Sequence, residues 1–147
     1  MNQVLQKARK YCSYQERSQQ EVRDKLYEWG LHRNEVEQAI AQLVSENYLN
    51  EQRFANAFAG GRFRMKQWGR IKIKMALQQK KVSERCIQEA LNELNEKDYL
   101  KSLKKVIADK SRTVKEPNAL KKNYKLAQYA MSRGFEPELV WGILKED

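Results

Sequence analysis

The residues of this chain best suited to chemistry are the cations of one segment, residues 62–81. No Asp or Glu occurs between Glu51 and Glu84, whereas both charge signs mix freely elsewhere. The cations of the segment are Arg62, Arg64, Lys66, Arg70, Lys72, Lys74, Lys80 and Lys81. A block of one charge sign is either a solvated tail or a surface that binds a polyanion. Because apolar residues recur at helical spacing through it, we interpret the block as a folded basic surface that binds nucleic acid or a nucleoprotein.

A helix that begins at Trp68–Gly69 would position part of this block. At about 100° per residue, Ile73 and Leu77 face inward and the cations face outward. The predicted binding residues are Arg62, Arg64, Lys66, Arg70, Lys72, Lys74 and Lys81. Each phosphate that they neutralise would release counterions, so binding should weaken with salt.

Two aromatic residues of the segment have two open interpretations. Trp68 and Phe63 could stack on nucleobases, as aromatic residues do in proteins that bind single strands. They could also belong to the core, which is the commoner place for large aromatic residues in a small helical unit. No pattern here indicates base-specific readout, so we expect contacts mostly to the nucleic acid backbone.

Other candidate chemistry is sparse. A zinc site needs about four ligands at suitable spacing, and the single histidine His32 with Cys12 and Cys86 does not supply them. Gly60–Gly61 is not followed by the Gly-Lys-Ser/Thr sequence of a phosphate-binding loop. We therefore predict a protein that is not an enzyme and that needs no metal ion or cofactor.

Composition and charge indicate a thin core and an acidic partner. The formal net charge of +10 favours partners rich in phosphate. Hydrophobic residues make up 41% of the chain, which is enough for a folded domain with a small core. The polar residues after Met1, the two distant cysteines and the lack of an apolar run of about 20 residues predict a cytoplasmic protein with free thiols and no membrane span.

Helix signals occur along the whole chain, and no segment shows the alternation of a strand. Ser18 with Glu21 forms a capping box that begins a second helix. Gly30 ends that helix in the manner of a left-handed C-cap. Asn34 with Glu37 is predicted to open a third helix.

The helical pattern repeats along the chain. Adding 51 to the residue number pairs Val22 with Ile73, and adding 104 pairs Val22 with Leu126. The same offsets pair Leu26 with Leu77 and Ala130, Val36 with Ile87 and Val140, and Ile40 with Leu91 and Leu144. The pattern predicts an all-α fold, an elongated, curved array of three tandem three-helix units. The expected units are residues 1–47, residues 48–95 with the basic surface, and residues 96–147 with a loop near 109–118. We expect a monomer.

Four motifs resemble the RecX family of bacterial regulatory proteins. They are Arg17-Ser18-x-x-Glu21-Val22-Arg23-x-Lys25-Leu26, Tyr48-Leu49-Asn50-Glu51-x-Arg53-Phe54-Ala55, Lys66-x-Trp68-Gly69-Arg70-x-Lys72-Ile73 and Ser132-Arg133-Gly134-Phe135. The resemblance runs nearly from end to end. The sequence departs from the family pattern in two places: Lys81 stands where a glycine is usual, and Gly60–Gly61 stand where larger residues are common.

The resemblance implies a modulator of the RecA recombinase in DNA repair, recombination and the SOS response. Such proteins lie in the helical groove of the RecA–DNA filament, bridge successive subunits and block recombinase and ATPase activity. The resemblance also implies sequence-nonspecific binding of single- and double-stranded DNA. The cations around Trp68–Gly69–Arg70 would face the groove, and reversal of Arg70 and Lys74 to Glu should abolish inhibition.

Two alternatives remain open at this point. A helix-turn-helix DNA-binding protein would need a recognition helix that reads bases and usually a symmetric dimer. The predicted third helix carries Glu35, Glu37 and Glu46, which would repel a major groove. A general nucleic-acid-binding helical protein would bind DNA without acting on RecA.

Overall fold

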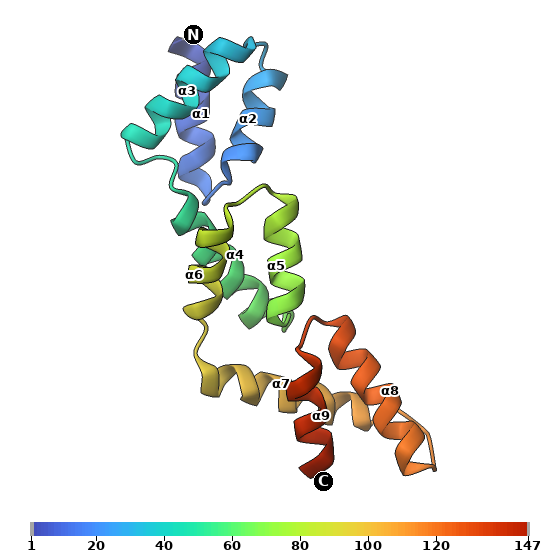
Figure 1. Cartoon of the computed structure of the whole chain (residues 1–147). Coiled ribbons are helices and arrows are strands. Elements are labelled where there is room, and N and C mark those ends of the chain that lie inside the picture. The colour runs from blue at the N-terminus through green and yellow to red at the C-terminus, as the bar shows by residue number, and fades with distance from the viewer. Residues whose placement is uncertain (1, 147) are drawn as a thin grey trace. The chain divides into compact units, whose positions relative to one another are not determined.

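The computed structural model describes residues 2–146, and all regular secondary structure within this range is helical (Figure 1). In chain order these are α1 (Asn2–Tyr14), α2 (Gln19–Glu28), α3 (Arg33–Ser45), α4 (Glu51–Lys66), α5 (Arg70–Gln79), α6 (Glu84–Asn92), α7 (Glu96–Ser111), α8 (Ala119–Ser132) and α9 (Pro137–Glu146). The all-α prediction is confirmed, since residues 2–146 include no strand. No helix in this range is long and apolar enough to cross a membrane.

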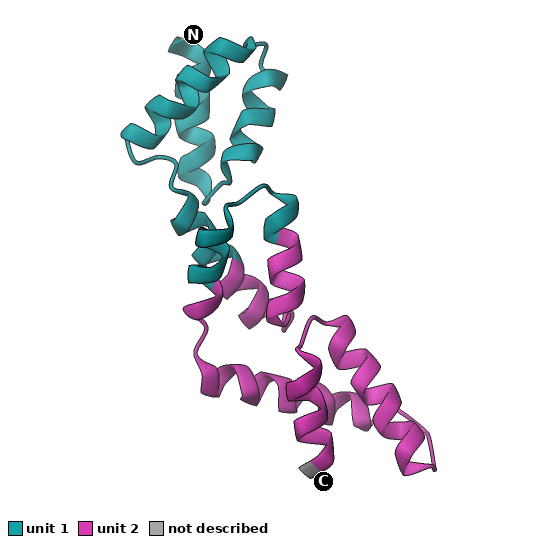
Figure 2. Cartoon of the chain, in the orientation of Figure 1, with its two compact units in different colours: residues 1–58, 77–90 teal, residues 59–76, 91–147 magenta. Residues whose placement is uncertain are grey.

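The chain divides into two compact units (Figure 2). The first consists of residues 1–58 and 77–90, and the second consists of residues 59–76 and 91–147. Helices α4, α5 and α6 each contribute residues to both units. The predicted boundaries of three repeats, after residues 47 and 95, come from sequence periodicity, whereas the two units come from contacts in the structure. The three-repeat division therefore stays a prediction.

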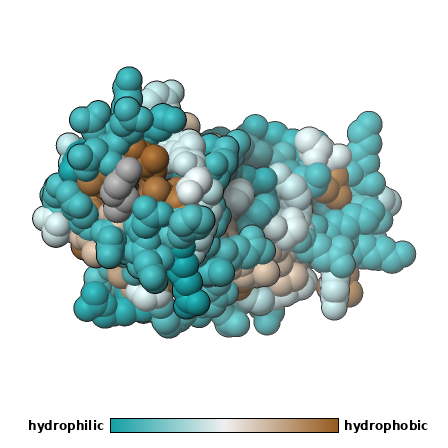
Figure 3. All heavy atoms as spheres, turned by 90° about the horizontal axis from the view of Figure 1, so that it is seen from above, coloured by the Kyte–Doolittle hydropathy of each residue, from teal (hydrophilic) through white to brown (hydrophobic). Residues whose placement is uncertain are grey.

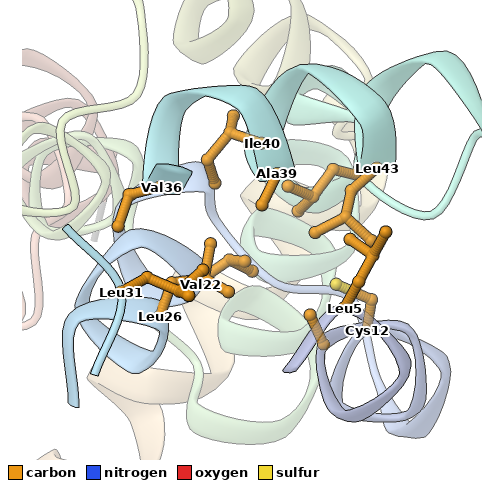
Figure 4. Close-up of a cluster of buried hydrophobic side chains, with 11 residues drawn as sticks. Leu5, Cys12, Val22, Leu26, Leu31, Val36, Ala39, Ile40 and Leu43 are labelled. Carbon is orange, nitrogen blue, oxygen red and sulfur yellow. The ribbon is translucent and has the colours of Figure 1, made fainter. Parts of the chain in front are cut away.

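The first unit has an apolar core where α1, α2 and α3 meet (Figure 4). Val22 and Leu26 of α2 are fully buried and face Val36 of α3, while Leu5 and Cys12 enter from α1. Burying one such aliphatic side chain contributes about 1.5–3 kcal/mol. Most of the face of the molecule in Figure 3 is hydrophilic, and hydrophobic residues occupy only small areas of it.

The structure confirms the predicted start of α2 and corrects the predicted start of α3. The Ser18 capping box is confirmed, because Ser18 Oγ accepts a hydrogen bond from the Glu21 amide at 3.0 Å. The predicted start of the third helix at Asn34 is wrong. Helix α3 begins after His32, whose amide donates to Glu35 Oε1 at 3.1 Å. Glu37 is not available for capping because its carboxylate accepts a hydrogen bond from Arg23 Nε at 2.8 Å.

The predicted loop at residues 109–118 begins too early. Helix α7 continues to Ser111, and an ion pair from Lys105 Nζ to Asp109 Oδ2 at 3.2 Å joins successive turns near its end. A run of charged residues does not end a helix when opposite charges lie four residues apart, because such pairs stabilise the helix. Asn118 closes the shorter loop by accepting a hydrogen bond from the Lys121 amide at 3.0 Å. Pro137 occupies the first position of α9, as expected.

Three turns separated by the predicted offsets share one backbone geometry. Gly30, Lys81 and Gly134 all have positive φ, at 95°, 60° and 97°. In each turn the next residue donates its amide to the carbonyl five residues earlier: Leu31 to Leu26 at 3.1 Å, Val82 to Leu77 at 3.2 Å and Phe135 to Ala130 at 3.2 Å. This is the Schellman pattern that ends a helix. The offsets of 51 and 104 therefore connect positions with the same conformation.

Lys81 is the one member of this set that is not glycine, and this predicts a stabilising substitution. A side chain with a Cβ costs about 1–2 kcal/mol in the left-handed region, so Lys81→Gly should raise the free energy of unfolding by about 0.5–1 kcal/mol. Urea unfolding followed by circular dichroism measures the change. Lys81→Ala removes the same charge but keeps the Cβ, and an equal gain from it would assign the effect to charge instead.

Candidate functional site

Most of the basic segment, residues 62–76, lies in the second unit and runs from the end of α4 through a short turn into α5. Gln67 ends α4 in the left-handed conformation, with φ of 56°, and its amide donates to the Phe63 carbonyl at 3.1 Å. Gly69 accepts a hydrogen bond from the Ile73 amide at 3.1 Å and so begins α5. The turn therefore places the last cations of α4 next to the first cations of α5.

The start of α5 is joined to the turn that follows α8. The amide of Gly69 donates to the Arg133 carbonyl at 2.8 Å, and the amide of Ile71 donates to the Gly134 carbonyl at 3.0 Å. The first amides of a helix have no partner within the helix, and here two of them bond to another chain segment. A Cβ on Gly69 would lie 2.3 Å from the carbonyl carbon and oxygen of Gly134. Only glycine permits this approach.

We call this contact between the start of α5 and the turn after α8 the joint. The side chain of Arg133 adds further hydrogen bonds to it. Its Nε donates to the Gln67 carbonyl at 3.4 Å, and its Nη2 donates to the Lys66 carbonyl. A guanidinium at the end of a helix satisfies its last carbonyls and complements its dipole. The third and fourth motifs of the sequence, which lie far apart in the chain, thus contact each other.

Arg70 is held by a network of side chains within the second unit. Its Nη1 donates to Glu136 Oε2 at 2.8 Å, and its Nη2 donates to Glu96 Oε2 at 2.5 Å. Its guanidinium carbon lies 3.8 Å from the ring centre of Tyr99. The Tyr99 hydroxyl accepts from the Arg70 amide at 2.9 Å and donates to Glu136. Burial and the hydrogen bond to Glu136 raise the pKa of Tyr99, so its hydroxyl remains a donor.

This network limits what a substitution of Arg70 can test. The side chains of Arg70 and Glu136 are only 21% and 22% exposed, and burial opposes the Arg70 charge while the hydrogen bonds to Glu136 and Glu96 raise its pKa. A glutamate at position 70 would face these two carboxylates. Sequence reasoning missed the partners Glu96, Tyr99 and Glu136. A direct role of Arg70 in binding stays a prediction.

The two aromatic residues occupy different environments. Phe63 is 8% exposed, and its ring stacks on Tyr99 with the ring centres 5.8 Å apart. Trp68 is half-buried, with Lys72 Nζ 4.6 Å and the Arg62 guanidinium carbon 5.5 Å from its ring centre. Cations in these positions are attracted to the face of the ring. Trp68 therefore brings two predicted binding residues together.

The remaining predicted binding residues differ in exposure. Arg64 and Lys66 near the end of α4 are exposed, and Lys74 of α5 is half-buried. Lys81 is exposed in the first unit, so its place beside the other cations stays a prediction. The second unit thus contributes most of the predicted surface.

His32, Cys12 and Cys86, the residues considered for metal binding or nucleophilic chemistry, do not form a site together in the structure. Among residues 2–146, no group of three or more His, Cys, Asp or Glu side chains could hold a metal ion. Cys12 and Cys86 are buried as free thiols, and burial raises the pKa of Cys12 to about 11. A thiol with so high a pKa is a poor nucleophile at neutral pH.

Comparisons with known proteins agree on one family. A model described as RecX, first three-helix domain, matches residues 5–43, and one described as RecX, second three-helix domain, matches residues 50–91. Together the two matches span more than half of the chain. The matches enclose α2, α4 and α5 completely and most of α1, α3 and α6.

Individual relatives carry the same name. The regulatory protein RecX of Clostridium perfringens strain 13 is 31% identical over 131 residues, which are 88% of this chain and 61% of that protein. The regulatory protein RecX of Lactobacillus johnsonii is 29% identical over 136 residues, 92% of this chain and 50% of that protein. This chain therefore spans about half to three fifths of the length of these relatives. The crystal structure of RecX from Lactobacillus salivarius has the same fold, with a TM-score of 0.84 at 22% identity over 99% of this chain and 94% of that chain. The chain belongs to the RecX family of regulatory proteins.

Proposed function

We propose that this chain regulates RecA by binding the RecA–DNA filament and occupying its helical groove, so that recombinase and ATPase activity fall. The observation that carries the proposal is the match to both RecX three-helix domains, in a chain whose relatives are named regulatory proteins. The proposed role is binding rather than catalysis, in the cytoplasm and as a monomer, with an effect on recombination and DNA repair.

The basic segment is the proposed contact surface. The proposed residues are Arg62, Arg64, Lys66, Arg70, Lys72, Lys74 and Lys81. Trp68 supports part of this set by holding two of its cations over one ring. Acidic RecA surface and DNA phosphates are both suitable partners for such a surface. Since contacts of this kind are made to the backbone, the proposed DNA binding is nonspecific and covers single and double strands.

The test of this proposal is ATP hydrolysis by RecA on single-stranded DNA while the chain is titrated in. We expect inhibition at amounts well below those needed to coat the DNA, which a parallel DNA-binding titration without RecA determines. No effect on RecA combined with salt-sensitive DNA binding would instead indicate a general nucleic-acid-binding helical protein.

Charge reversal of three cations outside the Arg70 network, the exposed Arg64 and Lys66 and the half-buried Lys72, should remove the inhibition. Arg64→Glu, Lys66→Glu and Lys72→Glu avoid the Arg70 network, so helical content should not change. We expect half-inhibition to need at least about tenfold more protein, because each reversed contact replaces attraction by repulsion. The ATPase titration and the salt dependence of DNA binding measure the loss.

A matched control uses three exposed cations of the first unit, Lys10, Arg33 and Arg85. Reversing these to Glu changes the net charge by the same amount and should leave inhibition nearly intact. Equal losses from both triple variants would mean that total charge, rather than this surface, determines binding.

A further inference from the structure

A surface groove of the second unit lies between the end of α4 and the first half of α7. It has a volume of about 290 Å³. Its lining residues are Phe63, Arg64, Gln67, Asp98, Lys101, Ser102 and Lys105. All of them belong to the second unit. The groove therefore adds side chains of α7 to a region in which the sequence pattern indicated only α4 and α5.

The side chains of this groove are suited to an anion. Arg64 comes from α4, and Lys101 and Lys105 lie one turn apart on the same face of α7. Asp98 is the one carboxylate of the lining, so positive charge is in excess. A guanidinium binds phosphate oxygens through two parallel hydrogen bonds, and lysine adds a compact charge. Ser102 adds a hydroxyl that can donate to the same ligand.

Gly60 determines where Arg64 lies. A Cβ at Gly60 would be 2.8 Å from both terminal nitrogens of Arg64, so the guanidinium lies directly against the backbone of α4. A larger residue at position 60 would force this side chain to move. Gly60 thus leaves room for the position that Arg64 takes at the groove.

The existing ion pair of the groove does not prevent binding. Lys105 Nζ lies 3.2 Å from Asp109 Oδ2, but the two side chains are 64% and 48% exposed. Exposed pairs of this kind are weak and exchange readily with solvent ions. A phosphate held at the same time by Arg64 and Lys101 can therefore compete with Asp109 for Lys105.

We propose that this groove binds backbone phosphates of nucleic acid and so extends the proposed contact surface onto α7. The proposal rests on the proposed function and adds residues to its DNA-binding part. Nucleic acid is favoured over an acidic protein because Arg64 belongs both to the groove and to the basic segment. A polyanion with evenly spaced charges can contact both, whereas carboxylates on a protein surface are not regularly spaced.

The experiment measures binding of a fluorescent single-stranded oligonucleotide by anisotropy at several salt concentrations, with a duplex as a second arm. For Lys101→Glu with Lys105→Glu we expect affinity to fall about tenfold or more. The dependence of log affinity on log salt should become shallower by about 0.7 for each lost contact to single strands and by about 0.9 for each to duplex. Lys101→Gln with Lys105→Gln should show the same reduction in slope without added repulsion, and unfolding curves verify that each variant folds.

The control is Lys115→Glu with Lys121→Glu, two exposed lysines of the second unit that lie outside α7 and do not line the groove. Their reversal changes the charge equally and should alter affinity less than twofold. If the wild type inhibits RecA and binds DNA, and all these variants bind DNA equally well, the groove proposal is wrong while the proposed function stands. If the wild type inhibits RecA but binds no DNA, an acidic protein surface is the partner and the proposal is also overturned. If it does neither, both proposals fail.

Discussion

Gly69→Ala should destabilise the second unit by about 3 kcal/mol or more. The new Cβ would lie 2.3 Å from the Gly134 carbonyl carbon and oxygen, which are backbone atoms and cannot rotate away. The two turns would have to separate, and this would break the hydrogen bonds from Gly69 to Arg133 and from Ile71 to Gly134. A buried amide without a partner costs about 1–3 kcal/mol. Urea unfolding followed by circular dichroism measures the loss, and limited proteolysis should detect opening near the joint.

The control for Gly69→Ala is the same substitution at Gly61, inside α4. Nothing lies within 4 Å of a Cβ at Gly61. Because alanine has a higher helix propensity than glycine, Gly61→Ala should stabilise the chain by about 0.5–1 kcal/mol. The two substitutions should therefore have opposite signs. A Gly69→Ala protein as stable as the wild type would show that the two turns do not touch in solution.

Arg70→Ala should cost about 2 kcal/mol, a value reduced from that of a fully buried pair because the side chains keep some exposure. The loss would leave Glu96 and Glu136 without their shared cation and would uncover the ring of Tyr99. Arg70→Lys should recover only part of the stability, since an ammonium cannot bond both carboxylates through a planar fork or stack on the ring. Unfolding curves of the variants measure these differences.

A double-mutant cycle separates this structural role from a role in binding. Glu136→Gln keeps the shape of the side chain but removes its charge, so the cost of Arg70→Ala should be smaller in its presence, by roughly 0.5–3 kcal/mol of coupling. Additive effects on stability would contradict the network. Loss of RecA inhibition at unchanged stability would identify Arg70 as a contact residue. Lys66→Ala, which removes an exposed cation of the same segment, should leave stability unchanged.

The sequence was most informative where the signal is local. The buried positions Val22, Ile73 and Leu126 follow from helical periodicity, since each turn of helix buries the same face. The capping box at Ser18 also depends on only four residues. The start of α3 differs from the prediction because Glu35 and Glu37 could each serve a cap, and the local pattern does not distinguish them. In the structure Glu35 accepts from the His32 amide, and Glu37 pairs with Arg23.

The candidate site was less predictable because its contacts are distant in the chain. Arg70 is bound by Glu96 and Glu136, which lie 26 and 66 positions further along the chain. No periodicity of the sequence encodes such pairs. The cations of residues 62–74 stood out because no carboxylate interrupts them. Lys101 and Lys105 gave no such signal, because Asp98 and Asp109 lie close to them in sequence. Only folding brings these lysines next to Arg64 of α4, which lies about 40 residues earlier in the chain and tips the charge of the groove to positive.

The joint between the two turns has a consequence for synthesis on the ribosome. The Arg133 guanidinium bonds a carbonyl 66 residues earlier, at Gln67. Chains grow at about 5–20 residues per second. Several seconds therefore pass between synthesis of the first turn of α5 and synthesis of its partners Arg133 and Gly134. During this interval the free amides of this turn face solvent or a chaperone, and Arg70 lacks its partner Glu136. Nascent chains halted before residue 133 should therefore have a protease-sensitive α4–α5 turn, whereas α1–α3 has all the residues of its own core by then.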